Sequence, residues 1–261
     1  MTSYRKVLYT IEELAFFTLL IFAICSACGT ATFWSVSQSR IIIIATVSGM
    51  IGVFSPLLVE RILKINLSFF ADVLIAIDLT LGIILGEACQ CYYHIPNYDK
   101  LMHFFGTFQF AILGFSVSKF YLQETNNGKH QVLFSLIFGF FFAVAVEAMW
   151  EIYEYSFDCL CGTDMQKCIP DSYKDLIDSN GFLIASKESI AEFYSSPEGY
   201  RYAVADTMND IIVDTVGSLT GTFLCFLIYK LKPNNTFQII SRTQEDDGPL
   251  QEKEKYHKNS R

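Results

Sequence analysis

The sequence predicts an all-α membrane protein, a polytopic bundle of about six transmembrane helices with both termini in the cytoplasm. Of its 261 residues, 52% are hydrophobic and 15% aromatic, whereas only 18% are charged. Several uncharged runs approach the ~20 residues that an α-helix needs to cross a bilayer. The lipid bilayer is therefore the expected partner of most of the chain. No basic stretch of the kind that binds nucleic acid is present in the sequence.

Reading the apolar runs against the charges that interrupt them predicts where the helices lie. The six expected spans cover about residues 12–34, 41–59, 68–91, 101–119, 131–155 and 208–230. The first run could also be a signal peptide, but Glu12 and Glu13 interrupt the basic-then-apolar order of such segments, so we expect a retained helix. Near the outer end of the fifth span, Trp150, Tyr153 and Tyr155 are expected in the interfacial aromatic belt, with substrate stacking as the alternative.

The orientation follows from the basic residues of the short connections, because cytoplasmic loops carry the excess of lysine and arginine. Arg61 and Lys64 follow the second span and Lys230 and Lys232 follow the sixth, whereas the connection after the first span holds only Arg40. Both termini are therefore expected in the cytoplasm.

One transmembrane domain is expected over residues 1–231. It includes a long extracytoplasmic loop at 156–205, which mixes charged and aromatic residues and is expected to form a small cap of short helices. Residues 232–261 hold too few apolar side chains to fold alone, so we predict a flexible cytoplasmic tail there. The small residues of the "GSLTG" stretch at 217–221 are typical of close helix packing.

Ionisable residues of three predicted helices fall at the same depth in the membrane. Glu147, His103 and Asp214 each lie sixteen residues from the cytoplasmic end of their segment, which corresponds to about 24 Å along a helix. An intramembrane acid costs about 2.5–3.5 kcal/mol to insert, and such residues normally face the interior of a bundle with a partner. We therefore expect these three side chains to meet.

A second tier lies four residues further outward on the same three segments. It consists of Asp99, Glu151 and Asp210, which share a helical face with the first three residues because side chains at i and i+4 point the same way. Glu154 and Asp206 extend two of these faces outward. The two tiers are expected to line one pocket.

The third span adds two further acids. Asp78 is expected at about 21 Å from the cytoplasmic boundary, so a fourth helix can reach the same pocket. In the cytoplasmic half, Asp72 is the one strong candidate for a relay, and the inner halves of the fifth and sixth spans are nearly without ionisable side chains. A path for ions across the membrane normally needs polar groups along its length, so a cavity open to the outer side is favoured.

The acids of this pocket outnumber the nearby cationic partners, Lys100 and His103. Packed carboxylates repel one another unless they are protonated, paired with cationic side chains or bound to a cation. One imidazole with several carboxylates suits a divalent Mn²⁺, Fe²⁺, Zn²⁺ or Mg²⁺ ion. The expected metal ligands are His103, Glu147, Glu151, Asp210 and Asp214. The alternative is that protonated or hydrogen-bonded acids only lock the helices together.

Three of these stretches also resemble a known family. The segments "DKLMH" at 99–103, "EAMWE" at 147–151 and "DTMNDIIVDTVGSLTG" at 206–221 occur in the order typical of YjdF-like bacterial inner-membrane proteins, whose function is unassigned. The resemblance covers about residues 50–230, and the layout is more distantly similar to VanZ-like membrane proteins. It implies a multi-pass protein of the bacterial cytoplasmic membrane. The polar positions that it implies are Asp99, Lys100, His103, Glu147, Glu151, Asp206, Asp210 and Asp214. The chain departs from the pattern by an insertion at about 169–203.

Three functions stay open at the level of the sequence. The first is a metal-dependent enzyme acting on a lipid or envelope substrate, with Lys100 available for an anionic group and Asp99 or Asp206 as general base. The second is a cation transporter or sensor that uses the same carboxylates, with Asp78 and Asp72 as an inward path. The third is a noncatalytic membrane scaffold. The sequence holds no Ser-His-Asp spacing, phosphate-binding glycine loop or His-Glu-x-x-His motif that would narrow the reaction.

Overall fold

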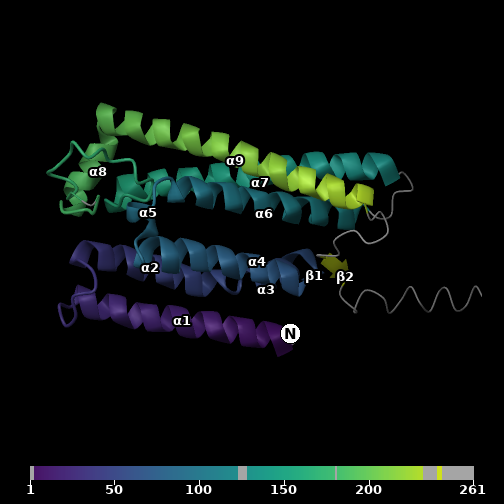
Figure 1. The fold of residues 1–261 in the computed structure, drawn as a ribbon, viewed down its shortest axis with the longest axis horizontal. Helices are drawn as coiled ribbons and strands as arrows, with labels where there is room; N and C mark the ends of the chain where they lie inside the picture. The colour runs from purple at the N-terminus through teal and green to yellow at the C-terminus, as the bar shows by residue number, and fades with distance from the viewer. Residues whose placement is uncertain (1–2, 123–127, 180, 232–239, 243–261) are drawn as a thin grey trace, which may run out of the picture.

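The computed structural model describes residues 3–122, 128–179, 181–231 and 240–242. Among these residues, six helical segments are long and apolar enough to cross a membrane: Ser3–Ala27, Gln38–Leu63, Phe69–Ala88, Tyr98–Tyr121, His130–Cys161 and Pro197–Leu231. The first three form one group of roughly parallel helices and the last three form another (Figure 1). The predicted class, a polytopic membrane bundle of about six helices, is confirmed.

The N-terminal group consists of α1 (Ser3–Ala27), α2 (Val36–Gly52), α3 (Ser55–Leu63), α4 (Phe69–Leu79) and the π-helix η1 (Thr80–Ala88). The second span divides into α2 and α3 because Pro56 lies in the first turn of α3, where its ring cannot continue a preceding helix. The third span changes from α4 to η1 without a break. Such i→i+5 winding is rare and occurs frequently at functional sites.

A buried ion network holds α1 against α3 and α4. Arg5 Nη1 lies 2.8 Å from Glu60 Oε1, while Arg5 Nε lies 2.7 Å from Asp72 Oδ2. The Tyr9 hydroxyl donates to Asp72 Oδ1 at 2.8 Å, and Glu60 Oε1 also accepts from the Leu67 backbone N–H at 2.7 Å. We refer to Arg5, Tyr9, Glu60 and Asp72 as the Arg5 clasp.

The C-terminal group consists of α6 (Tyr98–Tyr121), α7 (Gly128–Cys161) and α9 (Pro197–Leu231), which pack against one another. Glycines bring α6 close to both neighbours. A Cβ on Gly217 of α9 would lie 2.5 Å from the Phe104 carbonyl oxygen, and one on Gly139 of α7 would lie 2.7 Å from the Ala111 carbonyl oxygen. The close packing expected from the "GSLTG" stretch is confirmed at this contact.

The loop between α7 and α9 is shorter than the sequence analysis expected. The loop expected at 156–205 contracts to residues 162–196, which include the short helix α8 (Lys187–Ser195). Polar residues end the hydropathy pattern but not the helices, because a helix satisfies its own backbone outside the membrane as well as inside it. Gly162 ends α7 with a φ of +63°, and a Cβ there would lie 1.9 Å from the Lys187 carbonyl oxygen.

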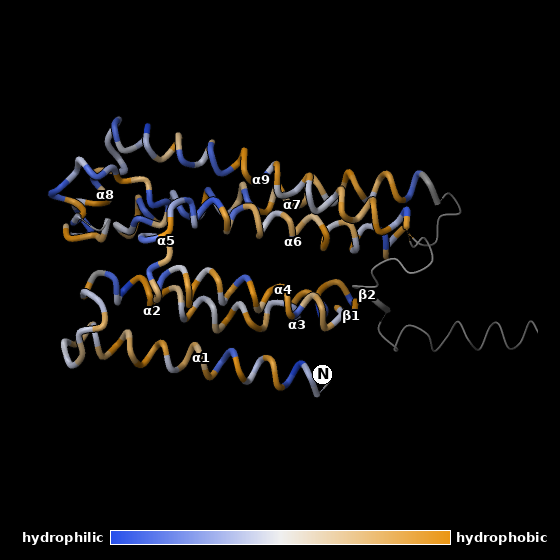
Figure 2. Tube along the Cα trace, in the orientation of Figure 1, coloured by the Kyte–Doolittle hydropathy of each residue, from blue (hydrophilic) through white to orange (hydrophobic). Residues whose placement is uncertain are grey.

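One carboxylate near the end of α7 organises this cap. Asp158 Oδ1 accepts from the Thr163 hydroxyl and from the Met165 backbone N–H, both at 2.7 Å, and Oδ2 accepts from the Gln166 N–H at 3.1 Å. The Gln166 side chain in turn donates to the Thr207 hydroxyl of α9 at 2.9 Å. The cap is therefore attached to both long helices, at their hydrophilic end (Figure 2).

A small β-ladder lies at the opposite end of the bundle. Strand β1 (Ile65–Leu67) pairs antiparallel with β2 (Ile240–Arg242), with Ile65 opposite Arg242. The remainder of the tail that we predicted at 232–261 lies outside the described residues. The short helix α5 (Cys91–His94) connects η1 to α6.

Candidate functional site

His103 lies at the centre of a group of carboxylates that come from α6, α7 and α9. Its Nδ1 atom is 3.4 Å from Asp214 Oδ1 and 3.9 Å from Glu147 Oε2. These are the three residues that the depth count placed in one layer. The structure brings them together because the three helices pack against one another and each presents one of the residues to the shared interface.

The second ring nitrogen of His103 faces the second tier. Its Nε2 atom is 3.5 Å from Glu151 Oε1 and 3.9 Å from both Asp99 Oδ1 and Asp210 Oδ1. Each tier of carboxylates therefore surrounds one nitrogen of the same imidazole.

Lys100 is already occupied by three carboxylates. Its Nζ atom lies 3.0 Å from Asp99 Oδ2, 2.7 Å from Asp206 Oδ1 and 2.7 Å from Asp210 Oδ1. The Lys100 side chain spans from α6 to α9 and places its ammonium near three carboxylates, so the anionic group expected there would have to displace at least one of them. Asp206 acts in this structure as a partner of Lys100.

We refer to Lys100, His103 and the seven carboxylates around them as the His103 cluster. The carboxylates are those of Asp99, Glu147, Glu151, Glu154, Asp206, Asp210 and Asp214. Most of the cluster is buried: the exposed fractions are 5% for His103, 2% for Glu151 and 1% for Asp214. Seven acids with two basic side chains leave an excess of negative charge in a region of low dielectric constant, which is costly without a further cation.

Several buried atoms of the cluster make only long contacts with their neighbours. Nδ1 of His103 is 3.4 Å from Asp214 Oδ1, and Nε2 is 3.5 Å from Glu151 Oε1, whereas well-formed hydrogen bonds are 2.7–3.2 Å long. Buried polar atoms in proteins are normally well paired, so such long contacts need an explanation such as an ion. Two donors bound to one metal ion at about 2.1 Å lie about 3.0–3.4 Å apart. The spacing between His103 Nδ1 and Asp214 Oδ1 is close to this range.

Two sets of donor atoms are close enough to hold an ion. The first consists of Asp99, His103 and Asp210, and the second of His103, Glu151 and Asp214; in each set the donor atoms lie within 4.8 Å of one another. Both sets combine one imidazole with two carboxylates, the chemistry that suits Mn²⁺, Fe²⁺ or Zn²⁺. The residues therefore fit a divalent metal ion, and Glu147 lies next to the second set.

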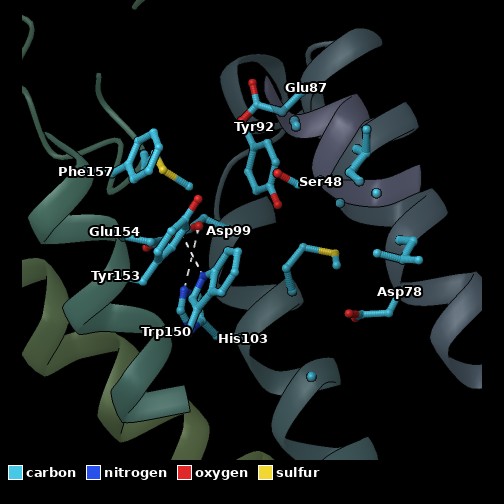
Figure 3. A pocket seen from close by; sticks show the side chains of 18 of the residues that line it. Ser48, Asp78, Glu87, Tyr92, Asp99, His103, Trp150, Tyr153, Glu154 and Phe157 are labelled. Carbon is cyan, nitrogen blue, oxygen red and sulfur yellow. Dashed lines mark hydrogen bonds and ion pairs between the residues drawn. The ribbon is translucent and has the colours of Figure 1, made fainter. Parts of the chain in front are cut away.

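A cavity of about 550 Å³ opens beside the cluster, between the N-terminal and C-terminal groups of helices. Figure 3 shows Asp99, His103 and Glu154 at one wall of this cavity, with Tyr92 and Ser48 opposite them. The ionisable side chains that line it are those of Asp78, Glu87, Asp99, His103, Glu147 and Glu154. Most of the remaining wall is apolar. The cavity therefore combines a group of ionisable side chains with a mostly hydrophobic lining.

Two aromatic residues expected in the interfacial belt also line this cavity. Trp150 donates its indole N–H to Glu154 Oε1 at 2.8 Å, and Tyr153 packs on Trp150 with 5.2 Å between the ring centroids. The positions of both residues near the outer end of a span are typical of the interfacial aromatic belt. The signal that sequence reasoning missed is their spacing from Glu147 and Glu154, which places all four on neighbouring faces of α7.

The acids of the third span have separate partners. Asp78 lines the cavity and accepts from the Gln109 amide at 3.3 Å, so a fourth helix does reach the pocket. Asp72, the candidate relay, is held instead by Arg5 and Tyr9 in the Arg5 clasp. This arrangement removes the residue on which an inward path depended and does not favour a transporter.

The cap contributes a buried cation to the rim of the cavity. Lys167 Nζ lies 3.1 Å from Glu87 Oε1 and is 4.9 Å from the centre of the Tyr93 ring. Burial opposes this charge, but the neighbouring Glu87, Tyr93 and Asp164 outweigh burial and hold the pKa of the Lys167 ammonium well above its ordinary value. Neither Lys167 nor its partners could be paired from the sequence, because Lys167 and Glu87 are eighty residues apart.

The comparisons with known proteins place the chain in a family without a described activity. Residues 14–231 match the family described as predicted membrane protein (DUF2238). The chain belongs to this family. An uncharacterized protein of Thermotoga maritima is 25% identical over 128 residues, which cover 49% of this chain and 65% of that relative, just under two thirds of its length. No solved structure matches. The family expected from the sequence is confirmed, and its unassigned function leaves the chemistry to be argued from the site.

Proposed function

We propose that this protein is a metal-dependent membrane enzyme whose His103 cluster binds one divalent ion beside a cavity for a lipid-like substrate. The observation that carries the proposal is the charge imbalance of the cluster: seven carboxylates surround one lysine and one histidine. A protein that needed the cluster only to join three helices would be more stable with fewer buried acids. Helix packing alone therefore does not account for it.

The residues that would hold the ion are His103, Glu151 and Asp214, whose donor atoms lie within 4.8 Å of one another, with Glu147 next to them; Asp210, the remaining predicted ligand, belongs to the other donor set, with Asp99 and His103. A bound divalent ion would supply Lewis acidity and lower the pKa of a bound water. Among the protein's own groups, Lys100 is held by Asp206 and Asp210 and presents its ammonium to Asp99. Asp99 lines the cavity next to His103, so it is the carboxylate best placed to accept a proton from a molecule in the cavity.

The substrate class follows from the composition of the cavity wall. The chamber of about 550 Å³ is the size of a small-molecule site, and its apolar side chains come from helices that cross the membrane. A polar floor joined to an apolar chamber suits a molecule with a head group and a hydrocarbon chain. The resemblance to bacterial inner-membrane proteins supports a place in the bacterial cytoplasmic membrane, and the distribution of basic residues supports termini inside the cell and the cap outside.

Elemental analysis tests the metal site. Purified full-length protein is expected to carry close to one equivalent of a divalent metal, whereas His103→Ala and Glu147→Gln are expected to retain a small fraction of it. Asp78→Asn is the matched control, since Asp78 lines the same cavity but bonds to Gln109. Wild-type protein that contains no metal and takes none up would contradict the proposal.

The enzymatic part needs a second measurement. Metal-loaded protein in vesicles of bacterial polar lipid is expected to change at least one lipid species, as detected by mass spectrometry of the extracted lipids. The same change should be lost after chelation and in His103→Ala. A lipid profile that is identical for wild type and His103→Ala would show that the site binds metal without acting on these lipids.

A further inference from the structure

The outer half of the cavity carries a row of aromatic rings on one face of α7. Trp150, Tyr153 and Phe157 follow one another at helical spacing, and the ring centroids are 5.2 Å and 5.1 Å apart. All three rings line the cavity, where Figure 3 shows them on the side that faces Tyr92. The faces of aromatic rings carry partial negative charge, so they attract cations and in particular alkylammonium groups.

A buried carboxylate stands beside these rings. Glu154 is only 7% exposed and lines the cavity. Its Oε1 atom accepts from the Trp150 indole, while Oε2 has no hydrogen-bond partner among the described residues. Asp99 lies on the neighbouring wall. Rings and carboxylates together form the pattern that recognises a positively charged head group.

Among the described residues that line this part of the cavity, no lysine or arginine is present for an anionic head group. The ionisable side chains lining it are five carboxylates and His103. The two nearest lysines are both paired, Lys100 with three carboxylates and Lys167 with Glu87. Even one bound divalent ion would leave the surroundings of His103 negative.

The protein already binds one of its own ammonium groups in this way. Lys167 Nζ lies 4.9 Å from the Tyr93 ring centre and 5.6 Å from the Tyr92 ring centre, with Glu87 at 3.1 Å. Two aromatic rings and one carboxylate thus hold a cation at the rim of the cavity. The row on α7 repeats this combination, with Glu154 in the place of Glu87 and with no cationic side chain of the described residues over the rings.

We expect the cavity to be reached from the membrane between α2 and α7. Helix α2 packs on α1 and η1, whereas α7 packs on α6, α8 and α9. Ile44 of α2 and Met149 of α7 line the cavity and are 40% and 71% exposed, respectively. Both lie within spans, so the hydrocarbon chain of a lipid can pass between them.

We infer that the cavity binds a lipid-like amphiphile with a cationic ammonium head group, which enters between α2 and α7 and places its head against Trp150, Tyr153, Phe157 and Glu154. This inference rests on the proposed function in naming the substrate class of the same site. The binding itself does not need the metal, because Glu154 is not among the residues assigned to the ion. The hydrocarbon chain occupies the apolar wall.

Tryptophan fluorescence gives a direct test, because the chain has two tryptophans. Trp34→Phe leaves Trp150 as the reporter in full-length protein in detergent. The probes are dodecyltrimethylammonium and dodecyl phosphate, each brominated on the chain carbons next to the head group so that a head group bound beside Trp150 quenches its fluorescence. We expect saturable quenching by the ammonium probe at a concentration about tenfold or more below that for the phosphate probe.

Variants separate this inference from the proposed function. In the Trp34→Phe background, Glu154→Gln keeps the acceptor for the Trp150 indole but is expected to lose most of the preference for the ammonium probe, while it retains the metal. His103→Ala is expected to lose the metal and keep the preference. Equal quenching by both probes, or an unchanged preference in Glu154→Gln, would overturn the inference. Wild-type protein that takes up no divalent metal but prefers the ammonium probe would overturn only the proposed function.

Discussion

The Arg5 clasp and the His103 cluster are two buried groups of charges in one bundle, and they are built on opposite principles. In the clasp, one guanidinium meets two carboxylates, and Tyr9 and the Leu67 N–H supply further donors. In the cluster, two basic side chains share seven carboxylates, and His103 lies 3.4–3.9 Å from five of them, whereas the ion pairs of Arg5 are 2.7 Å and 2.8 Å long.

The difference shows how a structural ion network is distinguished from a binding site. A clasp is complete without a ligand, because its donors and acceptors are nearly matched and it joins α1 to α3 and α4. A cluster with a large excess of one charge is incomplete until a ligand supplies the opposite charge. Burial alone does not separate them, since Asp72 and Asp214 are both 1% exposed.

The largest expected effect comes from breaking the clasp. Arg5→Met leaves Asp72 and Glu60 buried without their cation, which is expected to lower the free energy of unfolding by about 3–5 kcal/mol. Thermal unfolding in detergent measures the loss. Arg5→Lys keeps the charge but loses the planar guanidinium, so its melting temperature should lie between those of wild type and Arg5→Met. A melting temperature of Arg5→Met equal to that of wild type would show that the clasp does not stabilise the bundle.

In the His103 cluster, removing a charge is expected to raise the free energy of unfolding rather than lower it. Glu151→Gln removes one of several like charges and, in metal-free protein, is expected to raise the free energy of unfolding by an amount on the order of 1–4 kcal/mol. With saturating Mn²⁺, wild type should become more stable than Glu151→Gln, because the variant has lost a metal ligand. If Glu151→Gln destabilised the metal-free protein as Arg5→Met does, the His103 cluster would be a structural ion network like the Arg5 clasp and not a binding site.

A smaller effect is expected from crowding one ligand without changing any charge. A Cβ on Gly106 would lie 2.7 Å from Glu147 Oε1, so Gly106→Ala should displace that carboxylate and weaken metal binding about tenfold. Calorimetric titration with Mn²⁺ measures the change. Gly82→Ala is the control, since a Cβ there meets only ordinary contacts at 3.7 Å and 3.8 Å in the same cavity. Equal Mn²⁺ affinities for Gly106→Ala and Gly82→Ala would show that Glu147 is not a metal ligand.

The part of the site that the sequence could predict is the part set by helix geometry. Counting residues along three spans grouped His103 with Glu147 and Asp214, because membrane helices run nearly parallel and rise by a fixed amount per residue. The same count also placed Asp78 near the pocket. To predict which of these residues meet, it is enough to know the depth of each residue in the membrane and the face of the helix on which it lies.

The remaining features depend on how helices are arranged around one another. The clasp joins Arg5 to residues 55 and 67 positions away, and Lys100 reaches Asp210 across 110 positions. No depth count shows which of several acids a long lysine side chain will meet. The cavity lies between two groups of helices, so the roles of Trp150, Glu154 and Lys167 depended on the packing between the groups.

The central claim is that the His103 cluster binds a divalent ion, and the melting temperature of chelated protein titrated with Mn²⁺ tests it most directly. A ligand at one hundred times its dissociation constant stabilises the folded state by about 2.7 kcal/mol, which corresponds to a rise of several degrees for a chain of this size. Wild type and Asp78→Asn are expected to show this rise, and Asp214→Asn to show little or none. No rise in wild type, or an equal rise in Asp214→Asn, would contradict the account.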